Sequence, residues 1–286
     1  MTKHTNEARY GRPVPARPND GVAWITGASS GIGYALALEL AREGWHVIAS
    51  ARSQDKLNAL SAERIEGKGK ITAWPLDVTN RDANEAAVKG IEAEHGPIAL
   101  TVLNAGVFQP VAGEALDTDA FVKTFDVNLY GVVYSLVPLL AAMRQRGFGQ
   151  IAMVSSVTGY GGLPSSAAYG ATKAALINMA ECLKFDTDKF GVLLQVVNPG
   201  CVDTPATEEN AFEMPALVPV AKAAQRIAEG LRAGSFEITF PKRFTYALKL
   251  LQFLPYRAYF WLLKLGTKWN DRPLEPPLDH NRSTQD

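Results

Sequence analysis

A glycine-rich turn near the N-terminus constrains the fold more than any other feature of the sequence. An apolar run leads into the turn, since residues 22–33 read VAWITGASSGIG, and a helical pattern follows over residues 34–43. A strand, a glycine turn and a helix in this order are the usual context of a phosphate-binding loop. Glycine lets the backbone approach a ligand closely, and the first turn of the helix offers unpaired N–H groups to an anion.

Three interpretations of this turn compete. It can bind a dinucleotide, or it can be a tight structural turn. It can also be the nucleophile elbow of a serine hydrolase with Ser29 as nucleophile, because residues 27–31 fit G-x-S-x-G. A hydrolase needs a histidine beside that serine, but His46 opens a predicted strand, His95 ends a predicted helix and His280 lies in a polar tail. The positions of these histidines argue against the hydrolase.

Composition narrows the range of partners. A chain of 286 residues can form one large domain or two, and its formal net charge of zero gives no reason to expect a nucleic-acid partner. Cys182 and Cys201 form no CxxC pair, and we expect neither a disulfide framework nor a metal site. Residues 1–20 lack the apolar core of a signal peptide, and no uncharged apolar run is long enough to span a bilayer. These features together predict a cytoplasmic protein.

Apolar strand-like runs alternate with helical patterns between residue 20 and residue 240. The predicted strands occupy residues 22–26, 45–49, 71–76, 98–103, 151–155, 192–197 and 236–239. The predicted helices occupy residues 34–43, 53–65, 80–94, 118–145, 167–188 and 218–232. This alternation predicts an α/β fold, a doubly wound, mostly parallel seven-stranded sheet with helices on both faces. Ligands bind such sheets beyond the carboxyl ends of the strands.

Four polar residues are candidates for catalysis. Tyr169 and Lys173 lie four residues apart on a predicted helix and share a face, and a nearby ammonium lowers the pKa of a phenol towards the range of a general acid or base. Ser156 ends the fifth predicted strand, where it can donate to a substrate oxygen or simply form a turn. Asn128 lies inside a predicted helix, which is unfavourable for asparagine unless it has a role there.

In this order, the motifs resemble those of the short-chain dehydrogenase/reductase family. The matching motifs are TGxxxGxG at residues 26–33, NAG at 104–106, the helix Asn128, Ser156 with YxxxK at 169–173, and PGxxxT at 199–204. The resemblance covers residues 20–240 and departs from the family pattern at Leu103, where a second asparagine is commoner. It implies a Rossmann-type oxidoreductase. It also implies a tendency to form homodimers or homotetramers.

The resemblance implies roles for the four candidates. Tyr169 passes a proton to or from the reacting oxygen, and Lys173 holds the nicotinamide ribose and lowers the pKa of the tyrosine. Ser156 orients the carbonyl or alcohol. Asn128 anchors a water that relays protons. An alternative is a cofactor-binding regulatory or scaffold protein on the same fold, although such a protein has no need of all four residues.

The resemblance also implies a cofactor site. Its residues are Gly27, Ser29, Ser30, Gly31, Ile32, Gly33, Arg52, Asp77, Val78, Asn104, Ala105, Gly106, Tyr169, Lys173, Pro199, Gly200, Val202 and Thr204. The second predicted strand leads into Ser50-Ala51-Arg52, with no carboxylate to bond the ribose hydroxyls of NAD. Because Arg52 can pair with a 2′-phosphate, we expect NADP(H). The alternative is that Arg52 is a solvated residue at the entry of a helix.

The C-terminal part departs from the compact family pattern. Aromatic, aliphatic and basic side chains crowd residues 242–268, Pro255 divides two predicted helices, and no acidic residue lies between Glu237 and Asp271. Basic amphipathic helices predict contact with a membrane surface, on the cytoplasmic face. The alternatives are that the helices cap the substrate cleft or pack between subunits.

The apolar loop at residues 204–217 lies at the substrate-lid position of the family. Together with the C-terminal helices, it suggests a hydrophobic, lipid- or steroid-like carbonyl or alcohol substrate. We therefore divide the chain into a flexible basic tail (1–19), a catalytic domain (20–240), amphipathic helices (241–271) and a polar tail (272–286).

Overall fold

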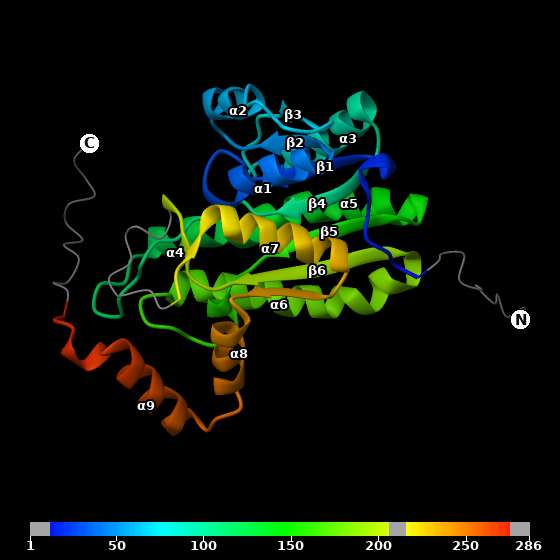
Figure 1. Ribbon diagram of the computed structural model, residues 1–286. Coiled ribbons are helices and arrows are strands. Elements are labelled where there is room, and N and C mark those ends of the chain that lie inside the picture. The colour runs from blue at the N-terminus through cyan, green and yellow to red at the C-terminus, as the bar shows by residue number, and fades with distance from the viewer. Residues whose placement is uncertain (1–11, 206–215, 275–286) are drawn as a thin grey trace, which may run out of the picture.

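Seven parallel strands form one sheet, as the sequence predicts. The computed structural model describes residues 12–205 and 216–274, so most of the loop at 204–217 lies outside the described residues. The strands are β1 (Val22–Thr26), β2 (His46–Ser50), β3 (Lys70–Ala73), β4 (Ile98–Leu103), β5 (Gly149–Val154), β6 (Val192–Pro199) and β9 (Glu237–Phe240). Their order is β3-β2-β1-β4-β5-β6-β9 (Figure 1). This is the doubly wound arrangement, in which successive strands are added on one side of β1 and then, from β4 onward, on its other side.

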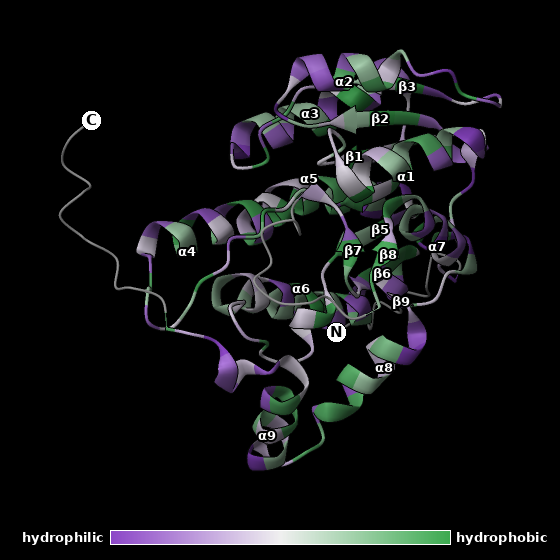
Figure 2. Cartoon of the chain, turned by 60° about the vertical axis from the view of Figure 1, so that its left-hand side comes forward, coloured by the Kyte–Doolittle hydropathy of each residue, from purple (hydrophilic) through white to green (hydrophobic). Residues whose placement is uncertain are grey.

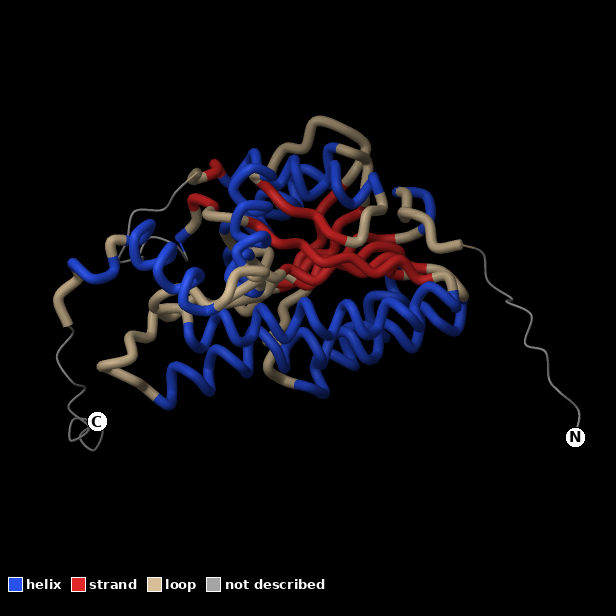
Figure 3. Tube along the Cα trace, turned by 90° about the horizontal axis from the view of Figure 1, so that it is seen from below, coloured by secondary structure: helices blue, strands red, loops and turns tan. Residues whose placement is uncertain are grey.

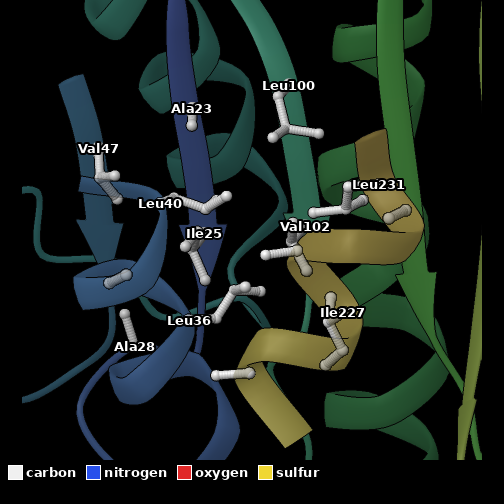
Figure 4. Close-up of a cluster of buried hydrophobic side chains, with 14 of the residues drawn as sticks. Ala23, Ile25, Ala28, Leu36, Leu40, Val47, Leu100, Val102, Ile227 and Leu231 are labelled. Carbon is white, nitrogen blue, oxygen red and sulfur yellow. The ribbon is translucent and has the colours of Figure 1, made fainter. Parts of the chain in front are cut away.

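Helices cover both faces of this sheet (Figure 3). They are α1 (Gly31–Arg42), α2 (Gln54–Ser61), α3 (Arg81–His95), α4 (Thr118–Phe125), α5 (Gly131–Arg146), α6 (Ala167–Thr187) and α7 (Val220–Ala233). On one face, α1 and α7 pack side by side over Ile25 and Val102, with Leu36 and Ile227 between them (Figure 4). On the other face, α3, α5 and α6 pack over a second cluster that includes Trp24. Because both faces are buried, the strands are continuously apolar.

The predicted helix at 118–145 is a longer helix with a local irregularity. Between α4 and α5, residues Asp126–Tyr130 form one π-helical turn, a widening that occurs often at functional sites. By length and composition the whole helix, Thr118–Arg146, could cross a membrane, although it is interrupted by charged residues. It packs instead on the sheet of this protein, where Leu139 and Met143 are fully buried.

Three predicted element ends are wrong by three or more residues, and one of them is the start of α1, which lies at Gly31 rather than at residue 34. The helix predicted at 53–65 ends at Ser61, although Ser53 caps its start as expected by accepting from the Lys56 N–H at 3.5 Å. The side chains of Glu63 and Arg64, which follow, are exposed. They therefore provide no buried contact that would hold another helical turn against the sheet. The strand predicted to reach residue 76 ends at Ala73, before Pro75.

Four further elements, two short strands and two helices, lie at the carboxyl ends of the strands of the sheet. A small two-stranded pair, β7 (Val202–Asp203) and β8 (Val218–Pro219), follows β6 and was not predicted. Two helices follow β9, namely α8 (Lys242–Leu251) and α9 (Tyr256–Thr267), with Pro255 between them as the sequence predicts. They extend away from the sheet as a hairpin, and apolar residues cover much of their surface (Figure 2).

Candidate active site

One cavity of about 1330 Å³ lies at the carboxyl ends of β1, β2, β4, β5 and β6. The predicted site residues that line it are Gly27, Ser29, Ser30, Gly31, Ile32, Arg52, Asp77, Val78, Asn104, Ala105, Gly106, Ser156, Tyr169, Lys173, Pro199, Gly200, Val202 and Thr204. The doubly wound topology brings these residues together although they are spread over most of the chain. Of the predicted residues, Gly33 and Asn128 do not line the cavity, and each instead supports residues that do.

The glycine turn is shaped for a ligand that approaches the backbone. Gly27 and Gly31 have φ angles of +69° and +55°, which residues other than glycine rarely adopt. A Cβ on Gly33 would lie 2.3 Å from the Gly27 carbonyl oxygen, so Gly33 lets α1 pack closely against the turn. This open cradle, which leads directly into the N-terminus of α1, fits the pyrophosphate of a dinucleotide.

The turn is held from the neighbouring strand. The Asn104 side chain donates to the carbonyl oxygens of Thr26 and Gly27 at 3.1 and 3.2 Å. In return, the Thr26 hydroxyl accepts from the backbone N–H groups of Asn104 and Ala105 at 3.0 and 3.1 Å. These four bonds tie the ends of β1 and β4 together.

Two cations line the cavity near the end of β2. Arg52 lies two residues after that strand and is exposed, and Lys56 lies in the first turn of α2. The sequence analysis missed Lys56. Its spacing of four residues from Arg52 is the signal that could have found it. Together the two side chains can hold a phosphate ester.

The catalytic candidates converge on the next part of the cavity. Lys173 of α6 is buried, and its Nζ donates to the Val154 carbonyl oxygen at 2.8 Å and lies 5.3 Å from the centre of the Tyr169 ring. The Ser156 hydroxyl hydrogen-bonds to the Tyr169 side chain. Phe108, which the sequence analysis missed, meets the Tyr169 ring edge to face at 5.1 Å. The hydroxyl groups of Ser156 and Tyr169 and the amine of Lys173 therefore lie in one cavity, as predicted.

The pKa of the tyrosine is shifted in the opposite direction to our expectation. Although Tyr169 keeps some exposure to the cavity, burial of its hydroxyl raises the pKa to about 12, and the bond to Ser156 offsets only part of this. Burial also lowers the pKa of Lys173 to about 8. The pKa of Tyr169 is therefore not lowered overall as we expected, because burial of its hydroxyl is the largest effect on it.

Asn128 acts on the loop that follows β4. Its side chain is fully buried in the π-helical turn, and its Oδ1 accepts from the Val107 N–H at 2.7 Å while its Nδ2 donates to the Val107 carbonyl oxygen at 2.9 Å. The Nδ2 also donates to the Thr172 hydroxyl at 3.4 Å, next to Lys173. The two bonds to Val107 fix the segment next to Gly106. The water relay implied by the resemblance remains a prediction.

The wall of the cavity beyond the catalytic residues is apolar. Its apolar side chains from α8 and α9 are Phe244, Leu248, Leu251, Leu262 and Leu263. The sequence analysis gave a cap over the substrate cleft as one alternative to membrane contact for these helices, and their position against the cavity agrees with that alternative. Arg272 pairs with Glu114 at the same mouth, so the segment after α9 is also fastened over the cavity.

The hydrolase interpretation of Ser29 finds no partner in the part of the chain that the structure describes. His46 begins β2, so it lies at the amino edge of the sheet, bonded to Thr72 at 2.9 Å and 5.1 Å from the ring of His95. Ser29 lines the cavity at the opposite edge. No group of three metal-binding side chains occurs among the same residues.

Comparison with known proteins agrees with this geometry. A family model described as short chain dehydrogenase matches residues 21–214. An uncharacterised oxidoreductase of Myxococcus xanthus is 35% identical over 82% of this chain and 92% of its own length. A 3beta-hydroxysteroid dehydrogenase of Mediterraneibacter gnavus is 32% identical over 72% of this chain and 74% of its own. Other relatives are longer proteins, and the match to this chain covers 15% of the length of one of them and 35% of the length of another.

Solved structures show the same fold. An alcohol dehydrogenase from the archaeon Thermococcus sibiricus, solved in complex with 5-hydroxy-NADP, superposes with a TM-score of 0.69 and 26% identity. The match covers 77% of this chain and 95% of that chain.

Proposed function

The chain belongs to the short-chain dehydrogenase family, and we propose that it is an NADP(H)-dependent oxidoreductase that interconverts a hydrophobic, lipid- or steroid-like carbonyl compound and its alcohol. The observation that carries the proposal is the meeting of Ser156, Tyr169 and Lys173 with the glycine turn in one cavity. The apolar wall from α8 and α9 completes that cavity and favours a hydrophobic substrate.

The residues present fit NADP(H). The glycine turn accommodates a pyrophosphate, Asp77 and Val78 line the part of the cavity expected for adenine, and Arg52 with Lys56 offers two cations to a 2′-phosphate. When bound, the nicotinamide supplies a hydride to a carbonyl carbon or accepts one from an alcohol. The NADP-type ligand in the Thermococcus sibiricus relative and the steroid named for the Mediterraneibacter gnavus relative support the cofactor and the substrate class.

We assign the proton transfer to Tyr169. In carbonyl reduction its phenol donates a proton to the substrate oxygen, while the Ser156 hydroxyl donates a hydrogen bond to the same oxygen. Lys173, held by the Val154 carbonyl oxygen, stands near enough to favour the phenolate that forms. The Asn128 clamp keeps the loop beside Gly106 in place.

The pH dependence should differ between the two directions. Because the pKa of Tyr169 is raised to about 12, its phenol is protonated at neutral pH and is ready to act as an acid. We expect kcat/KM for carbonyl reduction to be flat around neutral pH. In contrast, kcat/KM for alcohol oxidation should rise about tenfold per pH unit, since it needs the rare phenolate. An oxidation rate that falls with rising pH would contradict the assignment.

A substrate screen tests the function directly. Oxidation of NADPH and of NADH is followed by absorbance with steroid ketones, long-chain acyl ketones and small polar ketones. We expect turnover with the hydrophobic ketones and a lower Michaelis constant for NADPH than for NADH. Turnover of polar ketones alone would refute the substrate class, and a preference for NADH would refute the cofactor. Tight NADPH binding without turnover of any compound would favour the regulatory or scaffold alternative.

A further inference from the structure

The hairpin formed by α8 and α9 (residues 242–267) has two apolar faces rather than one. On α8, Phe244, Leu248 and Leu251 line the cavity, whereas Tyr246 and Leu250, with Phe253 just beyond the end of the helix, are exposed. Each set follows one helical stripe, and the two stripes lie on opposite sides of the helix. A helix that only caps a cavity needs one apolar face, so the outer face requires another explanation.

The outer face continues across the turn and along α9. Its most exposed aromatic members are Phe253 at 83% on the turn, and Tyr256 at 79% and Trp261 at 63% on α9. The turn between α8 and α9 points away from the sheet (Figures 1 and 2). Contiguous exposed apolar surface of this kind marks a site of interaction.

Basic residues occur along the same segment, residues 242–268. Lys242, Arg243, Arg257, Lys264 and Lys268 are all exposed. No described carboxylate forms an ion pair with any of these five, and the chain has no acidic residue between Glu237 and Asp271. The sixth cation of the segment, Lys249, faces inward and pairs with Glu237 at 2.6 Å. The surface therefore carries positive charge that the protein itself does not balance.

The hairpin is fixed to the segment that joins Ser156 to α6. The Tyr259 hydroxyl donates to the Gly162 carbonyl oxygen at 2.8 Å, and the Gln252 side chain donates to the Tyr160 carbonyl oxygen. The Tyr160 hydroxyl donates to Glu237 at 2.6 Å, the same carboxylate that binds Lys249. These contacts orient the outer face relative to the cavity mouth.

We propose that the outer face of the α8–α9 hairpin docks on the surface of an anionic phospholipid bilayer, with Phe253, Tyr256 and Trp261 in the interfacial region and the cavity mouth beside the lipid. Helices of 10 and 12 residues are too short to span a bilayer, but amphipathic basic helices with aromatic residues lie well in its interface. A second copy of this chain fits less well, because a symmetric contact would bring the five cations of each copy together without an acidic residue.

The docking itself does not depend on the oxidoreductase activity, whereas the delivery of a lipid-soluble substrate from the bilayer rests on the proposed function. Leu248 and Leu262 on the inner faces line the cavity together with the catalytic residues, so a hairpin docked by its outer face keeps its apolar inner face towards the site. In this arrangement an apolar ketone that leaves the bilayer at the cavity mouth meets an apolar wall.

Co-sedimentation of the full chain with vesicles, without substrate or cofactor, tests the docking. We expect binding to vesicles of equimolar phosphatidylcholine and phosphatidylglycerol, and much weaker binding to phosphatidylcholine alone. Each cation near an anionic surface strengthens partition about fivefold, so the double variant Arg257→Gln/Lys264→Gln should bind about 30-fold less. The double variant Phe253→Ser/Trp261→Ser should bind about 100-fold less, because two large apolar side chains leave the interface.

The matched control is Phe185→Ser, which removes a phenylalanine of 77% exposure from α6 and should leave vesicle binding unchanged. Equal sedimentation with both kinds of vesicle, or full binding by either double variant, would overturn the proposal. So would a Phe253→Ser/Trp261→Ser variant that binds vesicles normally but shows a lower mass in solution, which would identify the surface as a subunit contact. A chain that reduces ketones in solution but binds no vesicles would overturn the docking alone, and an inactive chain that binds would support it.

Discussion

Replacing Tyr169 by phenylalanine should lower kcat by about a thousandfold, the middle of the range for losing a positioned general acid. The variant keeps the ring that meets Phe108 edge to face and removes only the hydroxyl that hydrogen-bonds to Ser156. Because Arg52 and the glycine turn lie elsewhere in the cavity, the affinity for NADPH should change little. Turnover is measured with the best ketone from the screen, and NADPH binding by fluorescence.

Tyr130→Phe is the matched control, since it removes a phenolic hydroxyl from a tyrosine that is 48% exposed and does not line the cavity. Its kcat should equal that of the unmodified chain. Retained turnover in Tyr169→Phe would exclude Tyr169 as the proton donor. If the variant loses both NADPH binding and turnover, the hydroxyl is needed to shape the site rather than to transfer a proton.

Much of the sheet could be predicted because parallel strands covered on both faces are apolar throughout. The bounds of β4 match the prediction, since the run at residues 98–103 is apolar from end to end apart from Thr101 and is bounded by Pro97 and Asn104. The convergence of four motifs also followed from the sequence, because the glycine turn, the NAG motif, Ser156 and the PGxxxT motif each lie at the end of a strand, whereas Asn128 and YxxxK lie on helices. Parallel strands place such ends at one edge of the sheet.

The features that escaped prediction depend on contacts between distant segments. The π-helical turn holds Asn128 in two bonds with Val107, a partner 21 residues away that no local pattern identifies. The direction of the Tyr169 pKa shift depends on how completely the fold surrounds the hydroxyl, which the spacing to Lys173 does not reveal. The amphipathic pattern of α8 indicated an apolar face, but only the structure separates the stripe that lines the cavity from the exposed one.

Reversing the charge at Arg52 should change the cofactor preference. A charge-assisted hydrogen bond to phosphate contributes about 1.5–3 kcal/mol. Its loss in Arg52→Asp should therefore weaken the binding of NADPH by about 10- to 150-fold. The new carboxylate repels the 2′-phosphate and can bond the ribose hydroxyls of NADH. We therefore expect the ratio of kcat/KM for NADPH to that for NADH to fall by about a thousandfold, with most of the change in KM. Steady-state kinetics with both cofactors and one ketone measure this ratio.

Lys56 makes the experiment more discriminating. Because it lines the same part of the cavity, a residual attraction for NADPH should persist in Arg52→Asp and disappear in Arg52→Asp/Lys56→Gln. Arg64→Asp is the matched control, an identical change of charge at an exposed arginine outside the cavity lining, and its ratio should stay near that of the unmodified chain. If Arg64→Asp lowers the ratio as far as Arg52→Asp does, the preference comes from the general field of the surface. If neither variant changes the ratio, Arg52 is a solvated residue at the entry of α2, and another group must bind the 2′-phosphate.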